Sequence, residues 1–209
     1  PKTSTGFIDR FLVTAEAYRI PAVLLFNKID IYGDEGLEVV KQLKSIYEKI
    51  GYECHLISAL SEKDVQFVKN KMQGKINLIA GHSGTGKSTL INALDPSLNL
   101  TTGKISTAHE KGKHTTTFAE MFSLAGGGFV IDTPGIKEFG LVHIEREELS
   151  HFFLEIFKKS KDCKFGSCLH INEPKCAVIE AVEKGEIAAS RYYSYLGIVN
   201  GEELTKEYD

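Results

Sequence analysis

The sequence has no long hydrophobic run. Its longest clearly apolar stretch is Ala22-Val-Leu-Leu-Phe26, far short of the about 20 residues that a helix needs to cross a membrane. The first residues also lack the basic-then-apolar pattern of a secretory signal. Both absences predict a soluble, cytoplasmic protein that makes no contact with membranes.

Cysteine is scarce, and there is no excess of positive charge. Four cysteines in 209 residues are too few for a disulfide scaffold, and metal binding is the more common use of cysteines inside the cell. The chain carries 25 Lys and Arg against 28 Asp and Glu, a formal net charge of −3. This balance excludes a generally basic coat for nucleic acid, so any contact with RNA or DNA must be local.

What is present is an alternation of strand and helix patterns. Short apolar runs of strand length alternate with longer patterns of helical spacing. Strands are expected at residues 22–26, 53–57, 76–80, 118–124 and 129–131, with helices in the first twenty residues, over 35–50 and from Lys87. This order predicts an α/β fold with a mainly parallel sheet.

Beyond about residue 140 the pattern changes. Helical patterns there flank a loop that contains cysteine and histidine, and no further clear strand follows. The predicted organisation is an α/β domain over residues 1–142 and a small helical domain over residues 143–209.

The segment Gly81-His-Ser-Gly-Thr-Gly86-Lys87-Ser88 matches the pattern G-x-x-x-x-G-K-[ST] between a predicted strand and a predicted helix. Backbone amides of such a loop point at phosphate oxygens, and the helix N-terminus adds positive potential. Lys87 is expected to reach the β- and γ-phosphates and act in catalysis, and the Ser88 hydroxyl to ligate Mg²⁺. The predicted phosphate-binding residues are Gly81, His82, Ser83, Gly84, Thr85, Gly86, Lys87, Ser88 and Thr89. A glycine-rich turn that binds nothing is the alternative.

A second acidic element follows the phosphate loop. Phe129-Val-Ile-Asp132-Thr-Pro-Gly135 places Asp132 at the end of an apolar strand. There its carboxylate could hold Mg²⁺ through water, while the Gly135 amide meets the γ-phosphate. An ordinary strand-to-turn junction is the alternative, because Asp, Pro and Gly all favour turns.

A candidate base-reading motif, Asn27-Lys28-Ile29-Asp30, follows the first apolar strand. Guanine presents N1–H and N2–H₂ donors on one edge, and the Asp30 carboxylate can accept from both. Adenine would leave that carboxylate unpaired, so the pattern favours GTP over ATP. Ser58 and Ala59 end the next strand, where the Ala59 amide could donate to the guanine carbonyl oxygen. A strand ending in a polar turn is the alternative.

The order of these motifs is unusual. In most GTPases the base-reading motif follows the phosphate loop, whereas here residues 27–30 precede Gly81 and no second N-K-x-D occurs. Ligands of α/β sheets bind beyond the carboxyl ends of the strands, whatever order the chain visits them. The sequence is therefore interpreted as a circularly permuted P-loop GTPase.

Residues 106–117 form a polar segment typical of a nucleotide-sensing switch. One threonine of residues 115–117 is expected to complete Mg²⁺ coordination and act in catalysis, and Thr116 is favoured. A solvated loop without nucleotide contact is the alternative. Ile136 stands where many GTPases place a water-orienting glutamine, so slow intrinsic hydrolysis is expected.

A candidate metal centre lies near the end of the chain, formed by Cys163, Cys168, His170 and Cys176. Cys₃His is a common tetrahedral set for structural Zn²⁺, and it leaves no open position for catalysis. Unrelated thiols in a loop are the alternative, and the fourth cysteine, Cys54, is expected to fill the core. The lysines around the loop are either a solvated face or a local contact for RNA phosphates. They are Lys158, Lys159, Lys161 and Lys164.

In this order the motifs resemble the ribosome small subunit-dependent GTPase family (RsgA, also called YjeQ). Asp9-Arg-Phe-Leu-Val-Thr-Ala-Glu16 and Gly112-Lys-His114-Thr-Thr-Thr117 resemble it too, so the likeness spans nearly the whole chain. The family normally carries an N-terminal OB-fold domain. The chain, which begins at Pro1, is expected to lack that domain.

The resemblance implies an enzyme that hydrolyses GTP to GDP and phosphate during late maturation of the small ribosomal subunit, and that this subunit stimulates. It implies contact with the subunit's ribosomal RNA, and it makes His114 the residue that orients the attacking water. The expected cofactors are GTP or GDP, Mg²⁺ and Zn²⁺, and a monomer is expected.

Two other functions stay open on the sequence. One is a GTP-dependent switch that binds RNA or protein and whose hydrolysis is incidental, which Ile136 favours. The other is an ATP-using enzyme such as a small-molecule kinase, since a phosphate loop alone does not select the base.

Overall fold

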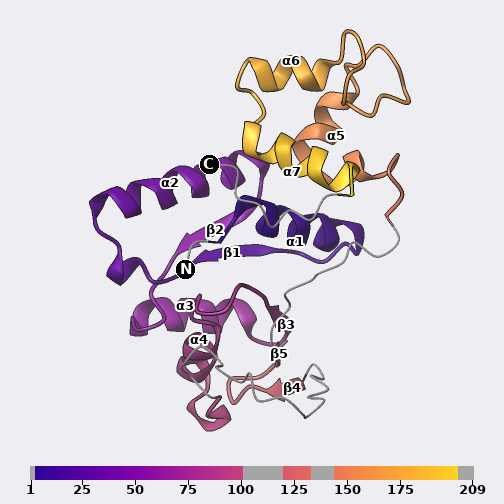
Figure 1. The fold of residues 1–209 in the computed structure, drawn as a ribbon. Helices are drawn as coiled ribbons and strands as arrows, with labels where there is room; N and C mark the ends of the chain where they lie inside the picture. Colours follow the sequence, from indigo (N-terminus) through magenta and orange to yellow (C-terminus); the bar gives the residue numbers. More distant parts are fainter. Residues whose placement is uncertain (1–2, 101–119, 133–143, 202–209) are drawn as a thin grey trace, which may run out of the picture. The chain divides into compact units, whose positions relative to one another are not determined.

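A computed structural model describes residues 3–100, 120–132 and 144–201 of the chain (Figure 1). The helices in chain order are α1 Thr5–Ala17, α2 Asp34–Ile50, α3 Glu62–Met72, α4 Lys87–Leu94, α5 Leu154–Ser160, α6 Ala177–Glu183 and α7 Ala189–Val199. The strands are β1 Val23–Phe26, β2 Glu53–Leu56, β3 Ile76–Ile79, β4 Glu120–Ser123 and β5 Phe129–Asp132. Short 3₁₀ turns occur at Ile29–Ile31, Pro96–Leu98 and Leu149–Phe152. None of the helices found in these ranges has the length and apolar character needed to span a membrane.

The helix boundaries follow local capping chemistry. Ser4 precedes α1 and its side chain accepts a hydrogen bond from the Phe7 amide, while Ser61 does the same for Asp64 at the start of α3. Such caps satisfy amides that have no partner inside the helix. The expected α/β alternation is confirmed, with strand and helix limits within a few residues of the predicted ones.

The chain folds as two compact units. The first contains Leu25–Lys44 and Cys54–Glu138, and the second contains Lys2–Leu24, Ser45–Glu53 and Phe139–Asp209. The units therefore do not follow chain order. The predicted boundary at residue 142 lies outside the described residues, and the division into domains 1–142 and 143–209 stays a prediction.

Strands β3, β4 and β5 lie in the first unit, and the predicted phosphate loop follows β3. The strand pairings found in the described ranges give a two-stranded sheet, β1–β2, and a three-stranded sheet in the order β3–β5–β4. Strand β3 runs parallel to β5, with Asn77 opposite Val130, and β4 runs antiparallel to β5. Val130 is fully buried in an apolar core that also takes in side chains of α3 and α4.

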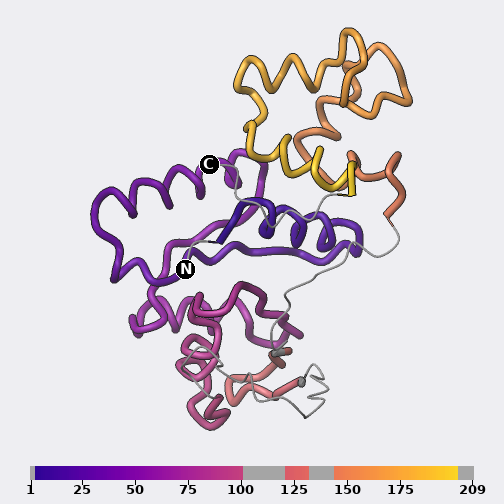
Figure 2. Tube along the Cα trace, viewed as in Figure 1, coloured from indigo at the N-terminus to yellow at the C-terminus, as the bar shows by residue number. Residues whose placement is uncertain are grey.

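The second unit joins the start of the chain to its end. Helix α1 packs on α7, and Figure 2 shows the indigo N-terminal helix beside the yellow C-terminal one. At this contact the Arg191 guanidinium, 1% exposed, donates to Asp9 at 2.8 Å and to Glu155 at 2.6 Å. The Tyr47 hydroxyl donates to the same Asp9 oxygen. A buried carboxylate needs such partners, so this network fixes α1 against α5 and α7.

Candidate nucleotide site and metal centre

The predicted phosphate loop connects the end of β3 to the start of α4, as expected. Gly84 and Gly86 adopt φ angles of +80° and +94°, a region that favours glycine. Left-handed residues in such a loop turn successive amides toward one side and create an anion-binding concavity. Ser83 is exposed on this loop, and Ser88 and Thr89 lie part-buried in the first turn of α4.

The Lys87 side chain bonds to the backbone of the phosphate loop. Its Nζ donates to the carbonyl oxygens of Gly81 at 2.7 Å and His82 at 2.8 Å, and the Thr85 hydroxyl donates to His82 as well. The ammonium group is thus held at the loop that the sequence assigns to phosphate. Partial burial and the charge of Lys87 lower the pKa of His82, so its imidazole is neutral at pH 7.

Asn27 ties the predicted base-reading motif to the phosphate loop. Its Nδ2 donates to the Thr85 carbonyl oxygen at 3.0 Å, and its Oδ1 accepts from the Lys28 and Ala59 amides at 2.8 and 3.0 Å. The packing is close, since a Cβ added to Gly86 would lie 2.5 Å from Asn27 Nδ2. Three segments far apart in sequence therefore meet at one side chain.

The rest of the predicted base-reading motif follows directly after Asn27. Lys28 adopts a left-handed conformation with φ of 71° and leads into the 3₁₀ turn that carries Asp30. The Asp30 side chain is exposed, where a ligand can reach it. The Ala59 amide, predicted to meet the guanine carbonyl oxygen, here donates to Asn27. Its contact with guanine stays a prediction.

Asp64 supports the segment that carries Ser58 and Ala59. Its Oδ2 accepts from the Ser58 amide at 2.9 Å, while Ser58 Oγ accepts from the Leu60 amide at 3.2 Å. In the sequence, Asp64 stands out only as an acidic residue three positions after Ser61. The Ser61-x-x-Asp64 spacing signals a capped helix start, but it does not show that the carboxylate reaches Ser58.

Several predicted site residues cannot be placed. Thr116, His114, Gly135 and Ile136 lie outside the described residues. Asp132 ends β5 as expected, and only its backbone is described. Ser88 is therefore the one predicted Mg²⁺ ligand whose side chain lies within the described ranges, and its hydroxyl is a suitable oxygen ligand for that ion.

The predicted metal ligands come together in the second unit. One ligand atom from each of Cys163, Cys168, His170 and Cys176 lies within 4.8 Å of all the others. His170 Nδ1 is 3.6 Å from the Cys163 sulfur and 3.4 Å from the Cys176 sulfur, and these two sulfurs are 3.9 Å apart. A tetrahedral zinc ion separates its ligand atoms by roughly 3.5–3.8 Å. The donor set and its spacing fit Zn²⁺.

Burial governs protonation at this cluster. It lowers the pKa of His170 and raises the pKa of the Cys168 thiol to about 12. Without a metal the Cys168 thiol is therefore protonated at neutral pH, and the His170 imidazole is neutral. Metal binding must release protons from the cysteines, as is usual for thiolate sites.

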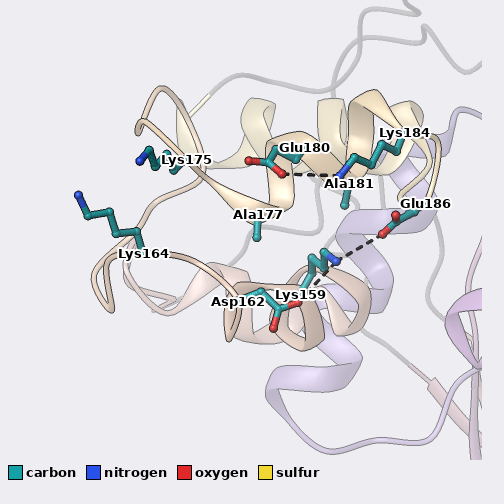
Figure 3. Close-up of a pocket in the computed structure, with 9 residues that line it drawn as sticks. All are labelled: Lys159, Asp162, Lys164, Lys175, Ala177, Glu180, Ala181, Lys184 and Glu186. Carbon is teal, nitrogen blue, oxygen red and sulfur yellow. Dashed lines mark ion pairs between the residues drawn. The ribbon is translucent and has the colours of Figure 1, made fainter.

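The lysines near this cluster are mostly engaged within the protein. Lys159 pairs with Asp162 at 3.5 Å and with Glu186 at 3.4 Å, beside a shallow groove between α5 and α6 (Figure 3). Lys161 and Lys164 lie over the rings of Phe157 and Phe165. Lys164 and Lys175 extend from the loops at one end of this groove (Figure 3).

Comparison with known proteins identifies the family. The sequence profile described as RsgA GTPase matches residues 1–142. The chain belongs to the RsgA GTPase family. It is 60% identical over 203 residues to the small ribosomal subunit biogenesis GTPase RsgA of Christiangramia forsetii, covering 97% of this chain and 64% of the relative. It is 55% identical to RsgA 2 of Bacteroides thetaiotaomicron, covering 99% of this chain and 66% of the relative.

Solved RsgA-like structures support the same fold. YjeQ from Thermotoga maritima matches with a TM-score of 0.80 and 39% identity, over 99% of this chain and 68% of that one. YloQ, described as a circularly permuted GTPase, matches with a TM-score of 0.76 and 34% identity, over 100% of this chain and 66% of that one. The predicted permuted fold is thus confirmed. The chain spans about two thirds of the length of the curated RsgA relatives that it matches.

Replacement of Asp64 tests its support of the base-reading segment. Asp64→Ala should weaken guanine nucleotide affinity about tenfold, because a hydrogen bond to a charged acceptor contributes about 1.5 kcal/mol or more. The hydrolysis rate of bound GTP should not change, since Asp64 bonds to the segment that is expected to meet the base. Fluorescent GDP binding and single-turnover hydrolysis measure the two effects.

The matched control is Glu62→Ala, which removes an exposed carboxylate from the same first turn of α3. Both variants lose a favourable charge at the helix N-terminus, but only one loses the contact with Ser58. Equal nucleotide affinities in the two variants would remove Asp64 from this role.

Proposed function

We propose that this chain binds GTP and hydrolyses it to GDP and phosphate in the maturation of the small ribosomal subunit. The observation that supports this most directly is the Asn27 side chain, which bonds both the phosphate loop and the Ala59 amide. A site so arranged can hold triphosphate and base at once. The relatives at 55–60% identity are named small ribosomal subunit biogenesis GTPases.

We assign one segment of the chain to the phosphates of the nucleotide and another to its base. Loop amides of residues 81–86 and Lys87 bind phosphates, with the α4 N-terminus adding positive potential. The Asp30 carboxylate accepts from the guanine N1–H and N2–H₂ groups. This pairing carries the preference for GTP over ATP.

Hydrolysis needs a metal ion and an oriented water molecule. The Ser88 and Thr116 hydroxyls would hold Mg²⁺, with Asp132 holding it through water. When bound, the ion would neutralise charge that develops on the phosphates. By its likeness to the RsgA family, His114 is given the role of orienting the attacking water, and Ile136 stands where many GTPases place a water-orienting glutamine. Intrinsic hydrolysis is therefore slow and depends on a partner.

The metal centre is proposed to hold Zn²⁺ in a structural role, since all four coordination positions are filled by protein ligands. Lys164 and Lys175, next in sequence to Cys163 and Cys176, offer a local contact for ribosomal RNA phosphates. The proposed protein is a monomer that acts in the cytoplasm.

Asp30→Asn tests base recognition without relying on loss of activity alone. Xanthine carries a carbonyl oxygen where guanine has its 2-amino group, and an asparagine amide can donate to that oxygen. The variant should lose GTP affinity by roughly 100-fold or more and bind xanthosine triphosphate better than the unchanged protein does. Competition against fluorescent GDP and its xanthosine analogue measures both effects.

Asp34→Asn, which changes an exposed carboxylate in the first turn of α2, serves as the control and should leave both affinities unchanged. If the unchanged protein binds ATP as tightly as GTP, or if Asp30→Asn gains nothing toward the xanthine nucleotide, the proposed base recognition is wrong.

Turnover with purified small ribosomal subunits tests the partner. GTP turnover should rise at least about tenfold, a small part of the roughly 10³–10⁵ that activating proteins give other GTPases. Large subunits serve as the control, and Lys87→Ala should abolish turnover in both cases. Unchanged turnover with small subunits would instead favour a GTP-dependent binding switch with incidental hydrolysis.

A further inference from the structure

One metal ligand is held in an unusual backbone conformation. His170 is 1% exposed and has a φ angle of +55°, a left-handed region that side chains other than glycine seldom adopt. Its Nδ1 atom faces the sulfurs of Cys163 and Cys176. Such a conformation persists only where the surroundings impose it.

A single carboxylate imposes much of this geometry. Glu173 Oε1 accepts from the Leu169 amide at 2.7 Å, and its Oε2 accepts from the Ile171 and Asn172 amides at 2.8 and 3.1 Å. The amides of Leu169 and Ile171 stand on either side of His170. Hydrogen bonds to a charged acceptor are stronger than those between neutral groups. Glu173 therefore fixes the backbone of the loop on both sides of His170.

Helix α7 holds the same loop from its carbonyl side. The Tyr195 hydroxyl donates to the Leu169 carbonyl oxygen at 2.7 Å, and the Tyr192 hydroxyl donates to the His170 carbonyl oxygen at 2.7 Å. The peptide group before His170 is thus fixed at its oxygen, and the peptide group after it is fixed at both its oxygen and its nitrogen. The ring is left little freedom to turn away from the thiols.

We propose that Glu173 is a positioning residue for the metal centre: with Tyr192 and Tyr195, it holds the His170 loop in the geometry that binds zinc. The proposal rests on the zinc site assigned above and is independent of GTP hydrolysis. A loop already in its metal-bound shape loses less conformational freedom on binding, so the ion binds more tightly. Groups that orient ligands in this way typically contribute 10–100-fold to metal affinity.

The experiment compares zinc affinity among variants of the full chain. Purified zinc-loaded protein is titrated with a chromogenic chelator, and both the equilibrium and the rate of zinc transfer are recorded. Glu173→Ala should lower zinc affinity 10–100-fold. Glu173→Gln should give an intermediate loss, because its amide oxygen can still accept while its NH₂ group faces other donors. Glu183→Ala, an exposed carboxylate of α6, is the matched control and should match the unchanged protein.

Two further measurements separate positioning from folding. Tyr192→Phe removes one hydroxyl and keeps the ring, so it should release zinc faster while the protein stays folded by circular dichroism. The absorption spectrum of Co²⁺-substituted protein reports the ligand geometry, and it should change in Glu173→Ala but not in Glu183→Ala.

The outcomes are distinct. If the unchanged protein binds no stoichiometric zinc, the assigned metal centre and this proposal both fail. If it binds zinc and Glu173→Ala and Tyr192→Phe bind it equally well, the positioning role alone is overturned. GTP turnover measured on the same samples reports separately on the proposed activity.

Discussion

The nucleotide site depends on the two-sided hydrogen bonding of one asparagine. The Asn27 side chain has a donor end and an acceptor end, and the structure uses both, on Thr85 58 residues away and on Ala59 32 residues away. A carboxylate at this position could not donate to Thr85, and a hydroxyl could not span both partners. The amide therefore brings the base-reading and phosphate-binding segments into one site, and the chain order of those segments becomes unimportant. This is the physical basis on which a permuted sequence can keep a GTPase site.

In the second unit, charged side chains connect segments that are far apart in the sequence. The buried Arg191 joins buried Asp9 from the start of the chain to the part-buried Glu155 near its end. The metal centre lies in the same unit, and two tyrosines of the Arg191 helix hold its ligand loop. Helix α7 thus contacts both the N-terminal helix and the metal-ligand loop. An apolar core that includes Val13, Ile156 and Tyr195 packs these short elements together, and the polar contacts add specific links between them.

Much of the site could be predicted because its chemistry is local in sequence. The phosphate loop of residues 81–88 and the Cys₃His set each lie within a few turns of chain, so spacing alone specifies them. The permuted order of the motifs predicts that the base-reading motif and this loop belong to one site, but the direct bond from Asn27 to Thr85 is known only from the structure. The α/β class followed from alternating patterns of strand and helix length.

What could not be predicted depends on contacts between distant residues or on backbone shape. Asp64 and Glu173 look like ordinary acidic residues of a helix start and a loop, yet each accepts backbone amides that shape a binding segment. Arg191 looks like a surface residue, because its spacing gives no sign of a carboxylate 182 positions earlier. That contact and the packing of Val13 in the core of the C-terminal helices group α1 with them.

The central claim is that Asn27 makes the base-reading and phosphate-binding segments a single site. The most direct test is the GDP affinity of Asn27→Ala, with Asn70→Ala, an exposed residue of α3, as the control. Hydrogen bonds of about 1 kcal/mol each predict at least a tenfold loss of GDP affinity in Asn27→Ala alone. A GDP affinity within about twofold of the unchanged protein would contradict the account.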